Sequence, residues 1–408
     1  MLNIEVAVIG GGPAGMMAAG TAAKNDKNLV LYEKKNRVGR KLMITGKGRC
    51  NITSAKSVEE LIENVPVNSS FLYSAFYSFS NEQLISLLNK MGLKTKVERG
   101  DRVFPESDRA RDVVDTLKRY VLKNGAKIKH KKVTSINKKD NFYILNFSNG
   151  DKVRAESVII ATGGLSYPKT GSTGAGYKFA SSLGHTIKKP YPSLVPLEIK
   201  EKWIKKVQGL SLKNISLTVL NKRKDEIFHE RGEMIFTHYG VSGPLVLSAS
   251  SHMRKMEDEE YIINIDLKPA LSYEKLDKRL QRDFKKYSNK YFGNSLSDLL
   301  PSKFIDIMIE LSSIDYEKTV NQITRDERKE LVKLFKNIKL HVKGYRPIEE
   351  AIVTSGGVDV DEVDPATMES KINNNLYFAG EVLDLDAYTG GFNLQIAFST
   401  AYLAGINV

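Results

Sequence analysis

The chain has very little cysteine and no long hydrophobic run. Cys50 is the single cysteine in 408 residues, which excludes an internal disulfide and a cysteine-based metal cluster, and we expect no metal site. The longest weakly polar stretch, 6–20, is interrupted by glycines and a proline. It falls short of the roughly 20 apolar residues that span a bilayer. We also find no signal-peptide pattern, so we expect a cytoplasmic protein without membrane contact.

Acidic residues are outnumbered by basic ones, and the two are unevenly distributed. Lys and Arg number 62 and Asp and Glu 48, so the net charge is 62 − 48 = +14. The first 200 residues hold 33 basic and 17 acidic groups, whereas residues 344–408 hold 2 and 10. A basic surface can bind nucleic acid, but most lysines here are scattered among acids. A solvated lysine-rich surface is therefore the favoured interpretation, and nucleic acid is an unlikely partner.

The N-terminal stretch predicts a dinucleotide-binding unit. Ile4–Ile9 is apolar and β-branched, which is typical of a strand buried on both faces. The turn Gly-Gly-Gly-Pro-Ala-Gly at 10–15 follows at once, and then come a helical segment of small residues, Ala14–Lys24, and a second strand at 28–32. Glu33 ends that strand. This strand–turn–helix–strand–acid order, with its spacing, is that of a Rossmann-type unit.

Each glycine of the turn has a physical reason. Gly10 permits the sharp turn out of the strand, Gly12 lets the backbone approach a pyrophosphate, and Gly15 lets helix and strand pack closely. Backbone N–H groups at the helix start then hold the phosphates, and Glu33 accepts hydrogen bonds from a ribose diol. The predicted cofactor residues of this part are Gly10, Gly12, Pro13, Ala14, Gly15, Glu33 and Lys34.

Three further segments combine glycine with charge. Residues 39–51 form a glycine- and cation-rich loop suited to wrapping an anion, and 161–164 follow a buried strand at the end where ligands bind. At 377–395 a strand ends in Gly-Glu, carboxylates follow, and a Gly-Gly turn opens a helix, which suits a ribityl chain and a flavin ring. The predicted cofactor residues here are Arg40, Lys41, Gly48, Arg49, Cys50, Asn51, Ala161, Thr162, Gly163, Gly380, Glu381, Asp386, Gly391, Phe392 and Asn393.

The order of the remaining elements predicts an α/β fold with an insertion. Three amphipathic helices (58–64, 81–91, 110–124) precede an antiparallel meander (132–137, 142–146, 152–155), and a buried strand follows at 157–161. Because cofactor motifs occur at both ends of the chain, we expect a discontinuous FAD-binding domain of residues 1–191 and 344–408. Residues 192–343 then form an inserted domain, strand-rich at 192–270 and helical at 271–337. Strand-like runs are also expected at 226–230, 233–237 and 350–353.

Four segments together resemble a known family: AVIGGGPAGMMAA with YEK, GRKLMITGKGRCNIT, VIIATGG, and FAGEVLDLDAYTGGFNLQIAFSTAYLAG. They are similar to bacterial FAD-dependent oxidoreductases of the glutathione-reductase/fumarate-reductase superfamily, in the branch named after aminoacetone oxidase and a bile-acid 3-oxo Δ4/Δ6-reductase. The resemblance implies that the glycine turn and Glu33 take the ADP half of FAD and that Val133 offers its backbone to the adenine. It also implies that 40–51 line the pyrophosphate and the flavin, and that Asp386 and 391–393 take the ribityl chain and ring. The same resemblance implies that the strand-rich part of the inserted domain is barrel-like.

These features favour an FAD-dependent oxidoreductase that moves hydride between bound flavin and a small organic substrate, by enone reduction or amine oxidation. NAD(P)H is one candidate partner, although no second glycine turn provides it with a Rossmann domain. None of the six histidines lies in the four segments, which favours non-covalent FAD. The alternative is a flavoprotein that acts on nucleic acid. Candidate catalytic residues are Cys50 and Tyr167, with Arg102, His238 and Tyr239 as further candidates for supplying a proton or an anchor.

Overall fold

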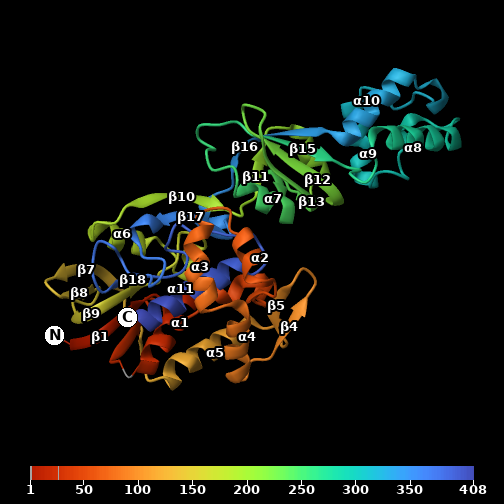
Figure 1. The fold of residues 1–408 in the computed structure, drawn as a ribbon. Coiled ribbons are helices and arrows are strands. Elements are labelled where there is room, and N and C mark those ends of the chain that lie inside the picture. Colours follow the sequence, from red (N-terminus) through yellow and green to blue (C-terminus); the bar gives the residue numbers. More distant parts are fainter. Residues whose placement is uncertain (1, 26) are drawn as a thin grey trace. The chain divides into compact units, whose positions relative to one another are not determined.

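The computed structural model describes residues 2–25 and 27–408. By their internal contacts these residues form two compact units, 1–193 with 347–408, and 194–346 (Figure 1). We expected the insertion at 192–343, and the second unit runs from Leu194 to Arg346. Each unit has a hydrophobic core of its own.

The first unit is built on a seven-stranded mixed sheet. Its order is β6-β2-β1-β9-β8-β7, with β18 paired to β9. Strand β1 runs parallel to β2 and β9, whereas β8 is antiparallel to both β7 and β9. The strands are β1 (Leu2–Ile9), β2 (Leu29–Tyr32), β6 (Lys127–Lys129), β7 (Val133–Lys139), β8 (Phe142–Phe147), β9 (Lys152–Ile160) and β18 (Leu376–Phe378).

Strand β9 corrects one prediction. We expected separate strands at 152–155 and 157–161, but residues 152–160 form one strand. Its first half pairs with the meander strand β8 and its whole length pairs with β1. Along β9, burial changes from alternating to continuous. The first half of the strand is therefore covered on one face of the sheet, and the last residues are covered on both faces.

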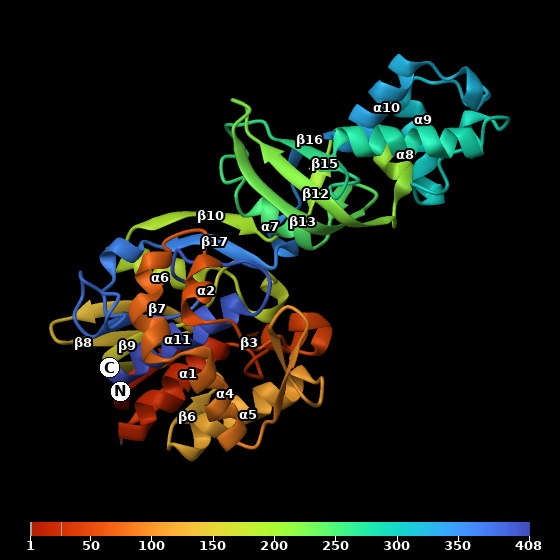
Figure 2. The ribbon, with the colours of Figure 1, turned by 45° about the vertical axis from the view of Figure 1, so that its right-hand side comes forward.

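Helices of small residues form the centre of the first unit. Helix α1 (Pro13–Ala22) is buried on nearly every side and packs against α11 (Phe392–Asn407) and α5 (Ala110–Lys123). Figures 1 and 2 both show α1 and α11 side by side. The other helices are α2 (Val58–Glu63), α3 (Tyr73–Ser78), α4 (Asn81–Lys90) and α6 (Ala175–Ser182). Ser57 and Ser80 begin α2 and α4 with capping boxes.

Two small sheets complete this unit. Strands β3 (Thr53–Ser54), β5 (Arg102–Pro105) and β4 (Thr95–Glu98) form one, and β10 (Ile187–Ser193) pairs with β17 (Val353–Val358). The strand expected at 350–353 is therefore displaced, because a 3-10 turn occupies Ile348–Glu350. Helix α3 and strands β4 and β5 were not predicted, since each is short and partly polar.

The second unit is a closed six-stranded barrel. Its strands are β11 (Leu197–Ile199), β12 (Ser211–Leu220), β13 (Glu226–Phe236), β14 (Gly240–Ser242), β15 (Ile262–Asp266) and β16 (Ile338–Tyr345). Its helices are α7 (Pro244–Ser250), α8 (Tyr273–Lys286), α9 (Ser302–Ser312) and α10 (Arg325–Lys336). Helix α7 packs against the barrel strands, and α8, α9 and α10 gather at one end (Figure 2). The two strands expected at 226–230 and 233–237 are one strand, β13. The predicted fold class, a Rossmann-type domain with a barrel-like and helical insertion, is confirmed.

Candidate functional site

The glycine turn has the geometry that its sequence predicts. Gly10 has φ +109°, and a Cβ there would lie 2.4 Å from the Ala161 carbonyl oxygen. A Cβ on Gly15 would lie 1.7 Å from the Gly10 carbonyl oxygen, so helix and strand pack too closely for any side chain. In contrast, a Cβ on Gly12 would meet no atom of the described residues within 4 Å. The backbone at Gly12 therefore faces open space at the start of α1, where a helix binds anions.

Glu33 is tied to the same turn. Its Oε2 accepts a hydrogen bond from the Gly11 N–H at 2.8 Å, and its Oε1 accepts one from the Lys35 N–H at 2.7 Å. Because a carboxylate has about four acceptor positions, two remain for a ribose diol. Next to it, the Lys34 ammonium donates to Thr173 Oγ1 at 2.7 Å. Burial lowers the pKa of Lys34 below its ordinary value, against the raising effect of Glu33.

We expect Glu33→Ala to weaken FAD binding by about 1.5–3 kcal/mol, the usual value of hydrogen bonds to a charged group. Isothermal titration of the flavin-free protein with FAD measures this change. Glu5→Ala is the matched control, since the Glu5 carboxylate also accepts a backbone bond, from Asn28 N–H at 2.7 Å, but lies at the start of β1. Equal FAD affinity in wild type and Glu33→Ala would contradict the ribose role of Glu33.

The loop 40–51 has an unusual backbone. Four of its residues, Gly46, Lys47, Gly48 and Cys50, have φ between +55° and +86°. The loop is closed by a bond from the Cys50 N–H to the Thr45 carbonyl at 3.0 Å. Because left-handed conformations cost energy in residues other than glycine, neighbouring contacts must hold this loop in place.

Arg49 supplies such contacts. Its guanidinium lies 2.5 Å from Glu98 Oε1 and 2.5 Å from Asp108 Oδ1, and 4.2 Å from the Phe104 ring centroid. The hydrogen bonds from Arg49 hold the pKa of the Glu98 carboxyl below its usual range. Arg49, which we predicted to contact the cofactor, therefore faces two carboxylates that anchor the loop.

A second ion pair joins the loop to the C-terminal part of the chain. Lys41 Nζ lies 2.7 Å from Glu381 Oε2 and 2.5 Å from Ser166 Oγ. Glu381 also accepts a hydrogen bond from the Thr354 N–H at 2.9 Å. The side chains of Lys41 and Glu381 are only 21% and 20% exposed. A Cβ on Gly164 would also lie 3.1 Å from Glu381 Oε1. Three of the predicted cofactor segments thus meet here, at the carboxyl ends of β9 and β18.

The C-terminal segment lies against both the glycine turn and β3. A Cβ on Gly380 would lie 2.9 Å from Ala14 Cβ, and a Cβ on Gly391 would lie 2.4 Å from the Thr53 carbonyl carbon. Gly391 (φ +103°) precedes α11 directly, and Phe392 begins the helix and is buried. The start of α11 therefore faces the same region as the start of α1.

Two polar residues of this segment shape it from within. The Asn393 side chain accepts a hydrogen bond from the Ala387 N–H at 2.9 Å and donates to the Ala387 carbonyl at 2.7 Å. Asp386 is fully buried and accepts from Ser193 Oγ at 2.6 Å. We predicted both as cofactor contacts, and the structure shows that both side chains also hold the 386–391 loop.

Unpartnered polar atoms mark where a ligand fits. Asn51 Oδ1 and Thr162 Oγ1 are buried and have no hydrogen-bond partner among the described residues. Gly163 (φ +71°) continues the segment of Thr162, and Val133 is the first residue of β7. Together with the open space at Gly12, these atoms fit a flavin dinucleotide that extends from α1 to the 40–51 loop. Ser166 and Thr354 were missed by sequence reasoning, because their role arises only from tertiary contacts.

The Cys50 thiol is fully buried in this loop. Burial raises the pKa of Cys50 to about 12, opposed by a hydrogen bond with Thr45. Since the folded-state pKa is raised, the thiol keeps its proton across the physiological range. Thiolate chemistry is therefore absent at neutral pH, and the buried thiol packs within the loop. Its contact with the flavin stays a prediction.

We expect Cys50→Ser to keep FAD and its reduction by the physiological donor, with a modest shift of the flavin spectrum. Because the thiol ionises only near pH 12, the wild-type spectrum should show no Cys50-dependent change between about pH 6 and 9. Absorbance spectra of both proteins across that range measure this, with reduction followed at 450 nm. Loss of flavin reduction in Cys50→Ser with FAD still bound would show that the thiol is essential.

The other candidate catalytic residues have varied settings. Tyr167 is partly buried at φ +53°, which is uncommon for an aromatic residue. Arg102 is exposed and donates to the Arg99 carbonyl. His238 and Tyr239 belong to the second unit and contact each other edge to face at 4.8 Å. Their catalytic roles stay predictions.

The fold and the site together define a class: flavin-dependent oxidoreductases built on a Rossmann-type domain. The family described as "HI0933-like protein Rossmann domain" matches residues 4–407, and the chain belongs to that family. Among the described residues, no helix is long and apolar enough to cross a membrane.

Several curated relatives match nearly the whole chain. The 3-dehydro-bile acid delta(4,6)-reductase of Clostridium scindens is 30% identical over 98% of both chains. The ribosomal RNA dihydrouridine synthase of Haemophilus influenzae is 31% identical over 99% of this chain and 98% of its own. The 3-ketosteroid delta1-dehydrogenase of Sterolibacterium denitrificans has the same fold, with a TM-score of 0.53 and 11% identity over 100% of this chain and 99% of its own. The predicted resemblance, FAD as cofactor and enzyme class are confirmed.

Proposed function

We propose that this enzyme reduces a carbon–carbon double bond conjugated to a carbonyl in a small organic substrate, with NAD(P)H as electron donor. The observation that carries the proposal is the full-length similarity to a relative named as a delta(4,6)-reductase. Amine oxidation, the other reaction that the sequence left open, has no such support. In such a substrate, an enone, the carbonyl makes the β carbon electrophilic. Hydride therefore adds to the β carbon, and a proton adds to the α carbon.

Different residues of the first unit bind different parts of the cofactor. The start of α1 with Gly12 binds the pyrophosphate, Glu33 binds the ribose, and Asn51, Asp386 and the start of α11 bind the flavin end. When bound, FAD supplies the hydride. The Cys50 thiol keeps its proton on Sγ and excludes water from its side of the ring. The Lys41–Glu381 pair holds two of these segments together.

A second candidate substrate is the uracil base of an RNA. Two observations favour it: the net charge of +14 and the full-length relatives named as ribosomal RNA dihydrouridine synthases. The chemistry is the same in kind, since the uracil C5=C6 bond is conjugated to the C4 carbonyl. The small enone and the RNA uracil therefore need the same hydride transfer. They differ in what the enzyme must bind around the reacting bond, which is a small molecule in one case and a polyanionic chain in the other.

Anaerobic stopped-flow mixing with NADH or NADPH tests the proposal. We expect one of them to bleach the bound flavin, and acid to release FAD and no FMN. A 3-oxo-Δ4 steroid added to the reduced enzyme should then restore the absorbance at 450 nm, and a uridine-containing RNA is the second oxidant to test. Bleaching by amines with no reoxidation by either acceptor would overturn the proposal.

A further inference from the structure

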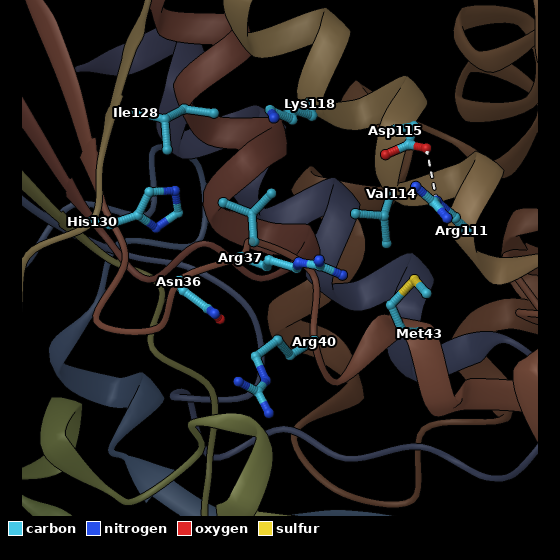
Figure 3. A pocket seen from close by; sticks show the side chains of 11 residues that line it. Asn36, Arg37, Arg40, Met43, Arg111, Val114, Asp115, Lys118, Ile128 and His130 are labelled. Atoms are coloured by element: carbon cyan, nitrogen blue, oxygen red, sulfur yellow. Dashed lines mark ion pairs between the residues drawn. The ribbon is translucent and has the colours of Figure 1, made fainter.

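A pocket of about 660 Å³ lies on the first unit, where the loop after β2 meets α5 and the end of β6 (Figure 3). Arg111, Val114, Asp115 and Lys118 face it from α5, three to four residues apart and so on one side of the helix. The other lining residues are Asn36, Arg37, Val38, Arg40, Met43, Ile128 and His130.

The lining of this pocket is strongly basic. It has four Lys or Arg side chains and one histidine, against a single carboxylate, Asp115. Asp115 lies 3.6 Å from Arg111, and Figure 3 shows this pair at one side of the pocket. In the described part of the chain, Arg37, Arg40 and Lys118 have no carboxylate within ion-pair distance. Three cations therefore surround the pocket without a counter-charge from the described residues.

The pocket lies on the α5 side of the 33–40 loop. On the other side of that loop, Lys34 contacts Thr173, and a Cβ on Gly171 would lie 3.5 Å from Lys34. Between these two sides the loop is closely packed: a Cβ on Gly11 would meet Val38, and a Cβ on Gly39 would meet Val114. The cofactor phosphates are already provided for by the glycine turn, so most of these cations have no role in the proposed chemistry.

We propose that this pocket is a docking site for the phosphodiester backbone of an RNA, and the proposal rests on RNA as the second candidate substrate above. Guanidinium groups bind phosphate oxygens in a bidentate manner, and Arg37 and Arg111 supply two of them, with the Lys118 ammonium as a third cation. The open, exposed setting suits a flexible polyanion that passes across the surface. The net charge of +14 favours the same partner through long-range attraction.

The test uses the FAD-loaded enzyme and a fluorescein-labelled single-stranded RNA of about 30 nucleotides without uridine, so that no substrate base contributes. The variant is Arg111→Gln/Lys118→Gln, both exposed on α5 and outside the cofactor residues. The control is Lys123→Gln/Lys178→Gln, which removes the same charge from exposed positions outside the pocket. Fluorescence anisotropy across a series of salt concentrations measures affinity.

We expect wild type to bind this RNA with an affinity that falls steeply with salt. The pocket variant should bind about tenfold or more weakly at about 0.1 M salt, with a log–log salt slope smaller by about 1.4, because two phosphate contacts of about 0.7 each are lost. The control should stay within about twofold of wild type, as non-contacting charges do.

Three outcomes would overturn the proposal: no salt-dependent binding by wild type, equal losses in variant and control, or a raised KM for NADPH but not NADH in the pocket variant with RNA binding unchanged. The last would assign the pocket to the 2′-phosphate of NADPH. Flavin reduction by NADH should be equal in all three proteins. Because RNA binding is measured without turnover, an enzyme that binds RNA but reduces no conjugated double bond fails the proposed function alone.

Discussion

Gly12→Val should give a folded protein that has lost its FAD. A Cβ at Gly12 meets no atom of the described residues within 4 Å, and the backbone there (φ −77°, ψ −175°) is extended, which valine adopts readily. The valine side chain instead fills the space in front of α1 where we propose that the pyrophosphate binds. Loss of two charge-assisted hydrogen bonds of about 1.5 kcal/mol each lowers FAD affinity by about 100-fold or more.

Two other glycines make this experiment specific. Gly344→Val is the matched control, since a Cβ there also meets no described atom within 4 Å and its backbone is not left-handed, but it lies on β16. Gly15→Val should not fold, because its Cβ would lie 1.7 Å from the Gly10 carbonyl oxygen. Flavin absorbance of the purified proteins and far-UV circular dichroism separate binding from folding. A yellow, folded Gly12→Val would refute this placement of the pyrophosphate.

The glycine turn could be predicted from the sequence because its signal is local. Strand, turn, helix and Glu33 lie within about 30 consecutive residues, and each glycine answers a steric need of its immediate neighbours. The same holds for the Rossmann-type sheet, whose buried strands are continuous apolar runs. That Cys50 stays outside redox cycling is a prediction of the same kind, since the chain has no second cysteine.

The function of Arg49 could not be predicted, because its partners are distant in sequence. Glu98 and Asp108 lie 49 and 59 residues further along the chain. Glu98 ends the short strand β4, and Asp108 lies in the loop before α5. A basic residue in a glycine-rich loop predicts a phosphate contact, and for Arg49 that contact stays a prediction. Its two ion pairs, which anchor the loop, give no such local signal. The loop-holding bonds of Asn393 were missed for the opposite reason: its amide binds its own turn, as asparagine side chains often do. Its contact with the cofactor stays a prediction.

Lys41→Met should destabilise the first unit more than any exposed ion-pair variant. It removes the cation that pairs with Glu381, which lies 340 residues further along the chain. The Glu381 carboxylate is then left without its partner in a setting where its side chain is only 20% exposed. A fully buried charge without a partner costs several kcal/mol. Because the Glu381 side chain keeps one-fifth of its exposure, we expect the free energy of unfolding to fall by about 2–3 kcal/mol. Chemical unfolding of the flavin-free protein measures it without a contribution from the ligand.

A double-mutant cycle shows whether the effect belongs to the pair. Lys41→Met/Glu381→Gln leaves no unpaired charge, and the new side-chain amide retains an oxygen that can accept from Ser166 and the Thr354 N–H. Stability should therefore recover by about 1 kcal/mol or more over Lys41→Met. The Lys206–Glu310 pair is the control, with the same 2.7 Å separation but side chains 63% and 51% exposed. Its cycle should give less than about 0.5 kcal/mol. If the two cycles gave equal coupling, the Lys41–Glu381 pair would be an ordinary surface ion pair, and the joining of the 40–51 loop to the C-terminal segment would depend on backbone packing alone.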